Sequence, residues 1–182
     1  MSSLAQPEPV PLDRPLLGAS LGQAVSRFWR KYATFSGRAS RSEYWWWYLV
    51  AVIVNGVLNS LGRSGGPVGG VFQGLAGLWS LAIVIPTLAL LWRRLHDTGR
   101  SGLWAFAPIA LGVIGTVLAI SGLFALHVAS GDGASLVPGG VLLGISGLAF
   151  VATLVVVLVL TLLPSNPAGE RFDRRAPYPV SA

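Results

Sequence analysis

Four long apolar stretches without a single Asp, Glu, Lys or Arg constrain this chain more than any other feature. A helix that crosses the hydrocarbon core of a membrane needs roughly 20 residues, and each stretch has about that length. We therefore predict an all-α integral membrane protein with four transmembrane helices. The predicted spans run from about Tyr44 to Leu61, Val71 to Trp92, Leu103 to Ala129 and Val141 to Leu163.

The composition agrees with a chain that is surrounded by lipid. Only 11% of the residues are charged, whereas a soluble domain has about 25%. The absence of cysteine excludes a disulfide framework, a thiolate metal site and a cysteine nucleophile. A net charge of +6 is typical of loops that face anionic lipid, so we expect no nucleic-acid partner.

The positive charges predict the orientation, because lysine and arginine accumulate in cytoplasmic loops. All but one of the 13 basic residues lie before the first span, between the second and third, or after the fourth. The exception is Arg63, in the turn between the first two spans. Aromatic residues mark the same side, with Tyr44 to Tyr48 opening the first span and Trp92 closing the second. We expect both termini to be cytoplasmic.

The segments outside the spans divide into two tails and a short helix. Residues 1–19 are rich in proline and lack the apolar core of a signal peptide, which predicts a disordered cytoplasmic tail. The four-span membrane domain is predicted over 20–172, and a cytoplasmic tail over 173–182. Helical periodicity from Ser20 to Phe35 predicts an amphipathic helix with an apolar aromatic face and a basic face. Such a helix either lies in the membrane surface or packs on the spans.

The apolar face of that helix consists of five residues, and its N-terminus has a capping pattern. The face comprises Leu21, Val25, Phe28, Trp29 and Tyr32, with Arg27, Arg30 and Lys31 largely off it. Ser20 and Gln23 have the spacing of a capping box.

Two polar segments beside the spans resemble a known family. They are YATFSGRASRSEYW at residues 32–45 and RRLHDTGRSGLW at residues 93–104. Together they resemble domain-of-unknown-function family 805, over roughly Phe28 to Phe172. The resemblance implies a small bacterial inner-membrane protein and implies no particular activity. Near the C-terminus, Glu170 and Asp173 stand where the family often has asparagine and glycine.

The two segments supply the candidate site, because adjacent antiparallel spans would bring them together on the cytoplasmic face. Glu43 or Asp97 can pair with an arginine there, and an arginine fork binds carboxylate or phosphate. One interpretation is a structural ion-pair cluster that locks the helix ends. The other is a site for an anionic lipid headgroup or phosphate, or for a protein partner. The candidate residues are Arg38, Arg41, Glu43, Arg93, Arg94, His96, Asp97 and Arg100.

Two further function classes have less support in the sequence. A lipid-modifying enzyme would use His96 and Asp97, but neighbouring helical residues point about 100° apart. No second histidine or carboxylate cluster completes a metal site, so we expect no catalytic residue, metal or cofactor. A small transporter or pore normally carries charged side chains within the membrane. The four predicted spans contain none.

The polar and small residues of the spans have a simpler interpretation as contacts between helices. The polar residues are Asn55, Asn59, Gln73, Ser80 and Thr87, and small-residue pairs stand at Gly115/Ala119 and Gly140/Gly144. We predict that they join helices through hydrogen bonds and close packing.

Overall fold

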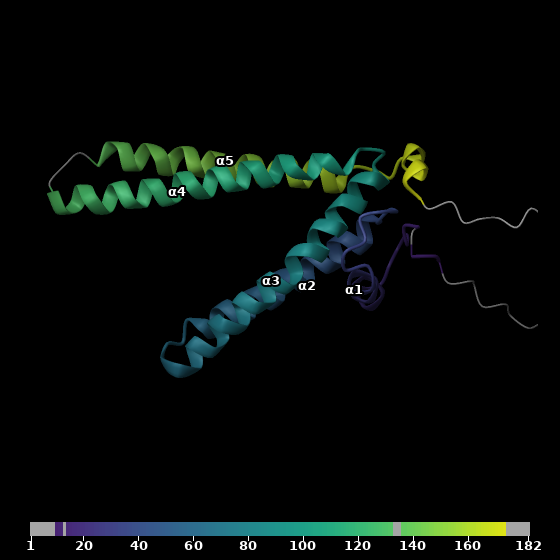
Figure 1. The fold of residues 1–182 in the computed structure, drawn as a ribbon, viewed down its shortest axis with the longest axis horizontal. Coiled ribbons are helices and arrows are strands. Elements are labelled where there is room, and N and C mark those ends of the chain that lie inside the picture. The colour runs from purple at the N-terminus through teal and green to yellow at the C-terminus, as the bar shows by residue number, and fades with distance from the viewer. Residues whose placement is uncertain (1–9, 13, 133–135, 174–182) are drawn as a thin grey trace, which may run out of the picture. The chain divides into compact units, whose positions relative to one another are not determined.

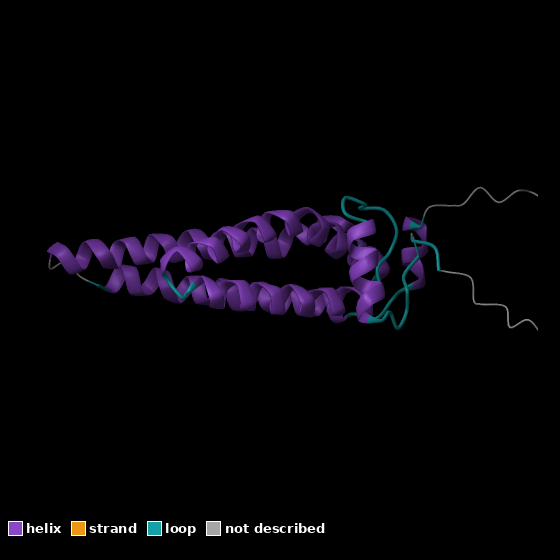
Figure 2. Cartoon of the chain, turned by 90° about the horizontal axis from the view of Figure 1, so that it is seen from below, coloured by secondary structure: helices purple, strands orange, loops and turns teal. Residues whose placement is uncertain are grey.

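The computed structural model describes residues 10–12, 14–132 and 136–173, and within these ranges it contains helices and no strand (Figure 2). Four helices are long and apolar enough to cross a membrane, which confirms the predicted all-α, four-span architecture. They are α2 (Arg41–Gly62), α3 (Gly66–Asp97), α4 (Phe106–Asp132) and α5 (Val137–Leu162). The shorter elements are α1 (Leu21–Arg30) and the 3-10 helices η1 (Gly102–Ala105) and η2 (Pro167–Phe172).

The chain forms two compact units. The first combines residues 1–102 with 164–182, and the second is the stretch 103–163. The predicted membrane domain over 20–172 therefore consists of two helical hairpins, α2–α3 and α4–α5 (Figure 1).

Helices α2 and α3 are longer than the hydropathy pattern predicts. The pattern starts α2 at Tyr44, whereas the helix begins at Arg41. Helix α3 has 32 residues, or about 48 Å at 1.5 Å per residue, and it continues through Arg93 to Asp97. Hydropathy stops at the first charged side chain, but the helix continues because Arg93 donates to Ala89 O and Arg94 pairs with Asp97, both within α3. Since the hydrocarbon core is only about 30 Å thick, α3 extends beyond it.

Hydrogen bonds from polar side chains mostly stay within a single helix of the first hairpin. Asn55 donates to the carbonyl of Ala51, and Asn59 to that of Asn55, both at 2.8 Å. Gln73 does join two helices, because its Nε2 donates to Gly62 O at 3.1 Å. The predicted role in joining helices therefore holds for Gln73 but not for these two asparagines.

Helix α1 packs against α2 and α3 (Figure 1). The predicted capping box of Ser20 and Gln23 is present. Phe28 is buried and stacks on Trp47, with ring centroids 3.3 Å apart, whereas Trp29 and Tyr32 are exposed. The helix thus packs on the spans through one edge of its aromatic face.

The charge distribution on α1 differs from the predicted one. Arg27 and Lys31 are buried, together with Ala24 and Phe28. These positions recur every three or four residues and so form one helical face. The prediction that Arg27 and Lys31 lie off the packed face is wrong, because both side chains are buried. Hydrogen bonds stabilise the buried Arg27 guanidinium, and the spacing of apolar residues does not reveal them.

Arg27 binds the described part of the segment before α1, which belongs to the tail predicted over 1–19. The Arg27 guanidinium donates to four backbone carbonyls at 2.5–3.4 Å, those of Val10, Pro11, Leu12 and Arg14. Ala19 N–H also donates to Ser42 Oγ at 2.9 Å. Residues 1–9 lie outside the described residues.

The second unit is the hairpin of α4 and α5, which approach closely at glycines. Ser146 Oγ donates to Gly115 O at 2.9 Å. A Cβ atom at Gly139 would lie 2.6 Å from Leu126 Cγ and 2.9 Å from Gly122 O. The predicted packing position Gly115 is correct, since its own Cβ would lie 3.4 Å from Ala149 Cβ.

The second predicted small-residue pair does not pack in this hairpin. Cβ atoms at Gly140 and Gly144 would meet nothing within 4 Å. The helix turns the neighbouring Gly139 toward α4 instead, because adjacent helical residues point about 100° apart.

Candidate functional site: the motif-end cluster

The two motif segments meet at one end of the α2–α3 hairpin, which we call the motif end. Ala39 N–H donates to Arg93 O at 3.1 Å. His96 Nδ1 lies 3.1 Å from Gly37 O. Since a carbonyl only accepts, this contact assigns the proton to Nδ1. Together with the C-terminal turn, these segments form what we call the motif-end cluster, residues 37–43, 93–100 and 165–173.

Glu43 is buried, and both of its carboxylate oxygens are hydrogen bonded. Oε1 lies 2.5 Å from Arg27 Nε. Oε2 accepts from Ser40 N–H at 2.8 Å and from Leu16 N–H at 3.2 Å. The expected pairing of Glu43 with an arginine is present, but the arginine comes from α1 and was not among the candidate residues.

A sequence signal for part of this arrangement exists at the start of α2. Ser40 and Glu43 have the Ser-x-x-Glu spacing of a capping box, and the structure contains that box. Ser40 Oγ accepts from Glu43 N–H at 3.2 Å. This spacing predicts Ser40 as the N-cap of α2 and Glu43 in its first turn. The ion pair of Glu43 with Arg27 depends on the fold of the N-terminal segment and has no such local signal.

Asp97 is the last residue of α3 and is fully buried. Its Oδ2 accepts from the Arg94 guanidinium one turn earlier on the same helix. It also accepts from Ser165 Oγ at 2.6 Å, and Asp97 O accepts from Asn166 N–H at 2.8 Å. The carboxylate therefore joins α3 to the segment that follows α5.

The C-terminal turn η2 contacts both motif segments. Arg38 forms a two-pronged ion pair with Asp173, at 2.9 Å from Nε to Oδ1 and 2.6 Å from Nη2 to Oδ2. This hydrogen bond raises the pKa of the Arg38 guanidinium above its ordinary value. Phe172 lies flat on the His96 ring with centroids 3.9 Å apart, and its carbonyl accepts from Gly37 N–H at 3.0 Å. Asp173, which differs from the family pattern, thus has a defined partner.

Two glycines shape this end of the molecule. Gly99 has φ +76° and ends α3 with a pair of bonds, Arg100 N–H to Leu95 O and Gly99 N–H to His96 O. These are the bonds of a Schellman motif. Gly169 packs so closely on His96 O that a Cβ atom there would overlap it.

The remaining arginines of the candidate set have different environments. Arg93 is only 1% exposed, its Nε donates to Ala89 O at 3.1 Å, and its Nη2 has no partner among the described residues. Arg41 is exposed and Arg100 is half-buried. Among the described residues, neither Arg41 nor Arg100 takes part in an ion pair. The five arginines therefore do not converge on one point, and Arg38 and Arg94 already bind carboxylates.

His96 and Asp97 are neighbours in the sequence but belong to different contacts of the motif-end cluster. His96 contacts Gly37 and Phe172, while Asp97 contacts Arg94 and Ser165, so the two neighbours have separate partners. Among the described residues no group of three or more His, Cys, Asp or Glu side chains is placed to hold a metal ion.

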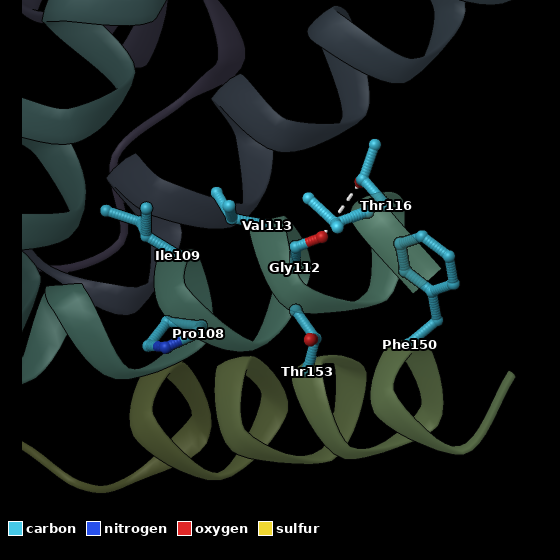
Figure 3. A pocket seen from close by; sticks show the side chains of 8 residues that line it. Pro108, Ile109, Gly112, Val113, Thr116, Phe150 and Thr153 are labelled. Atoms are coloured by element: carbon cyan, nitrogen blue, oxygen red, sulfur yellow. Dashed lines mark hydrogen bonds between the residues drawn. The ribbon is translucent and has the colours of Figure 1, made fainter. Parts of the chain in front are cut away.

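A hollow in the second unit is apolar. It has a volume of about 430 Å³ and lies between α4 and α5 (Figure 3). Two threonines line it, and their hydroxyls donate within their own helices, Thr116 to Gly112 O and Thr153 to Ala149 O. This hollow presents no charged side chain and no unpaired hydroxyl.

One family model, described as a protein of unknown function (DUF805), matches residues 32–174 and so includes the whole motif-end cluster. The chain belongs to the DUF805 family. The DUF805 match begins after α1, so Arg27 and the segment that it holds lie outside the matched residues.

Two proteins of Escherichia coli have similar sequences. Inner membrane protein YhaI of strain K12 is 45% identical over 76 residues, which cover 42% of this chain and 62% of YhaI. Inner membrane protein YhaH of the same strain is 39% identical over 77 residues, which cover 42% of this chain and 64% of YhaH. No solved structure matches the chain. Both relatives are inner membrane proteins, which agrees with the four apolar helices of this chain.

Proposed function

We propose that this chain is a non-enzymatic inner-membrane protein whose motif end faces the cytoplasm. In this proposal the buried part of the motif-end cluster locks the helix ends, and exposed basic residues around it bind anionic lipid headgroups. The similarity to the inner membrane proteins YhaI and YhaH supports the membrane assignment.

The distribution of basic residues supports the cytoplasmic orientation. The motif end includes four arginines, Arg27, Arg38, Arg41 and Arg94. The turn at the other end of the hairpin has a single basic residue, Arg63. Basic residues favour the cytoplasmic side of short loops. Both chain termini would then be cytoplasmic, because four spans return the chain to the side on which it began.

The structural role of the buried cluster rests on carboxylates that are paired with arginines. Glu43 accepts three hydrogen bonds, and Asp173 binds Arg38 through two. Arginines used in this way are not free to bind a ligand. The locking role therefore accounts for Arg38 and Arg94, while Arg41 and Arg100 remain available.

The observation that carries the headgroup proposal is the exposed Arg41 at the start of α2, which forms no ion pair with any residue that the structure describes. Arg30 is also exposed, next to the exposed Trp29 on α1. Basic side chains near an anionic membrane surface each contribute about 1 kcal/mol, and tryptophan favours the headgroup level. Charge and aromatic side chains thus occur together where headgroups would lie.

Lipid retention measured by native mass spectrometry tests this proposal. The full chain would be mixed with phosphatidylglycerol and phosphatidylethanolamine, and the Arg30→Gln/Arg41→Gln double variant compared with Arg63→Gln, which removes an exposed base at the opposite end. We expect the double variant to lose about thirtyfold in preference for phosphatidylglycerol, since two side chains contribute about 2 kcal/mol, and the control to change little. Equal retention by the double variant and the unmodified chain would refute headgroup binding at this surface.

A further inference from the structure

Helix α3 has a proline in its interior, Pro86. Proline has no backbone N–H, and its ring displaces the carbonyl of the residue four positions earlier in a helix. In α3 that carbonyl belongs to Ala82, which therefore lacks its usual helical partner. A free backbone carbonyl is costly in a membrane-spanning helix unless another group of the protein binds it. The Ala82 carbonyl thus needs a donor other than residue 86.

Tyr32, which follows α1, supplies that donor. Its hydroxyl donates to Ala82 O at 2.6 Å. The Tyr32 ring stacks on Trp29 with centroids 6.0 Å apart, and Trp29 contacts Trp79 of α3 at a centroid distance of 6.4 Å. One hydrogen bond and one ring contact therefore join α1 and the residue that follows it to the part of α3 before Pro86.

Pro86 divides α3 into two parts with different surroundings. Residues 66–85, which we call the α3 arm, have a single buried residue, Gly69. From Pro86 to Asp97 most residues are buried, and this part ends in the motif-end cluster. Sharp bends in helices occur mainly at prolines, because the hydrogen-bond ladder is interrupted there. Pro86 thus lies where a hinge would connect the α3 arm to the motif-end cluster.

Other contacts of α1 and of the segment after it lie on the cluster side of Pro86. Arg27 binds Glu43 in the first turn of α2. The segment that follows α1 bonds to the end of α3, where Ala39 N–H donates to Arg93 O at 3.1 Å. This part of the chain therefore bridges the proline, with attachments to the α3 arm on one side and to the motif-end cluster on the other.

We propose that α3 hinges at Pro86 and that α1 is a strap across this hinge, fastened by the Tyr32 hydroxyl. While Tyr32 binds Ala82 O, the α3 arm keeps one angle relative to the motif-end cluster. Release of α1 frees the carbonyl and allows the arm to bend. This device goes beyond headgroup binding, because it concerns the movement of a transmembrane helix and not the charge of a surface.

A double-mutant cycle tests the hydrogen bond. Tyr32→Phe removes only the hydroxyl and should raise the equilibrium constant for unfolding in mixed micelles about fivefold, roughly the value of one hydrogen bond. Tyr48→Phe removes the hydroxyl of another exposed tyrosine, on α2, and should leave the constant unchanged. In Pro86→Ala protein, residue 86 can donate to Ala82 O, so Tyr32→Phe should then have little effect. An equal effect in both backgrounds would overturn the assigned pairing.

Distances between spin labels test the movement itself, and the chain has no cysteine to interfere. Labels at Val68→Cys on the α3 arm and Ala168→Cys on η2, both exposed positions, report the distance across the hinge. Labels at Val68→Cys and Leu81→Cys lie on one side of Pro86 and serve as the control. We expect Tyr32→Phe to broaden the first distance distribution and to leave the second unchanged. An unchanged first distribution would overturn the strap.

Restoring the helical hydrogen bond separates a hinge at Pro86 from general loosening. The Tyr32→Phe/Pro86→Ala double variant should regain the narrow distribution of the natural chain between positions 68 and 168. A distribution that stayed broad would refute a hinge at this position. Neither substitution changes a charge, so retention of phosphatidylglycerol should equal that of the natural chain, and failure of the headgroup proposal would not affect these results.

Discussion

Arg27 shows how a charged side chain can be buried at the edge of a membrane protein. Its guanidinium binds Glu43 and four backbone carbonyls of the N-terminal segment. A buried charge is costly unless it is paired and hydrogen bonded, and here each of its three nitrogens has a partner. Arg27 thereby links the segment before α1 to the start of α2.

Replacing Arg27 with methionine should destabilise the protein strongly. The change leaves the Glu43 carboxylate buried without its cation, and loss of one partner of a buried ion pair costs about 3–5 kcal/mol. The free energy of unfolding in mixed micelles measures the effect. Arg30→Met is the matched control, because Arg30 is an exposed arginine on the same helix, and its change should stay within about 0.5 kcal/mol.

The Arg27→Met/Glu43→Gln double variant completes this test. Removing the stranded charge should recover part of the lost stability, because the remaining amide is cheaper to bury than a carboxylate. Equal stability of the Arg27→Met and Arg30→Met single variants would contradict the role assigned to Arg27.

Helices are the elements that the sequence predicts best here. The four spans follow from apolar length alone, and the start of α1 follows from the spacing of Ser20 and Gln23. The same spacing at Ser40 and Glu43 marks the true start of α2, which hydropathy places later at Tyr44. Local hydrogen-bonding patterns therefore define helix ends more accurately than apolar content does.

Contacts between segments far apart in the sequence are harder to predict. The sequence correctly brings the two motifs together, but the pairing of Glu43 with Arg27 requires the segment before α1 to fold back. Asp173 binds Arg38 across almost the whole chain. Such partners depend on the tertiary fold, which local periodicity does not contain.

The α4–α5 hairpin offers a test at the scale of one element. Gly139→Ala should destabilise it by about 1–3 kcal/mol, because the added methyl group would overlap Leu126 and a tightly packed helix cannot easily accommodate it. Gly140→Ala adds the same group where a Cβ atom meets nothing within 4 Å. That neighbour should be neutral or gain about 0.5–1 kcal/mol from helix propensity.

Thermal unfolding of both variants in detergent measures this difference. A larger loss for Gly140→Ala than for Gly139→Ala would show that the described face of α5 is not the one that packs on α4.

For the whole molecule, the central feature is the separation of apolar helices from one polar, basic end of the first unit. The spans carry large exposed hydrophobic side chains along their length, as lipid-facing helices do. Charged residues of the first unit gather instead at the motif end, where carboxylates neutralise some arginines and others stay exposed. The proposed function requires this end to face the cytoplasm.

Labelling of single cysteines in intact bacterial cells tests that orientation most directly, and the natural chain contains no cysteine to interfere. Ser64→Cys places a thiol in the turn between α2 and α3, and Ala168→Cys places one on η2, both at exposed positions. A maleimide that does not cross the inner membrane should label position 64 in intact cells and position 168 only after the membrane is permeabilised. Labelling of position 168 in intact cells, with position 64 protected, would contradict a cytoplasmic motif end.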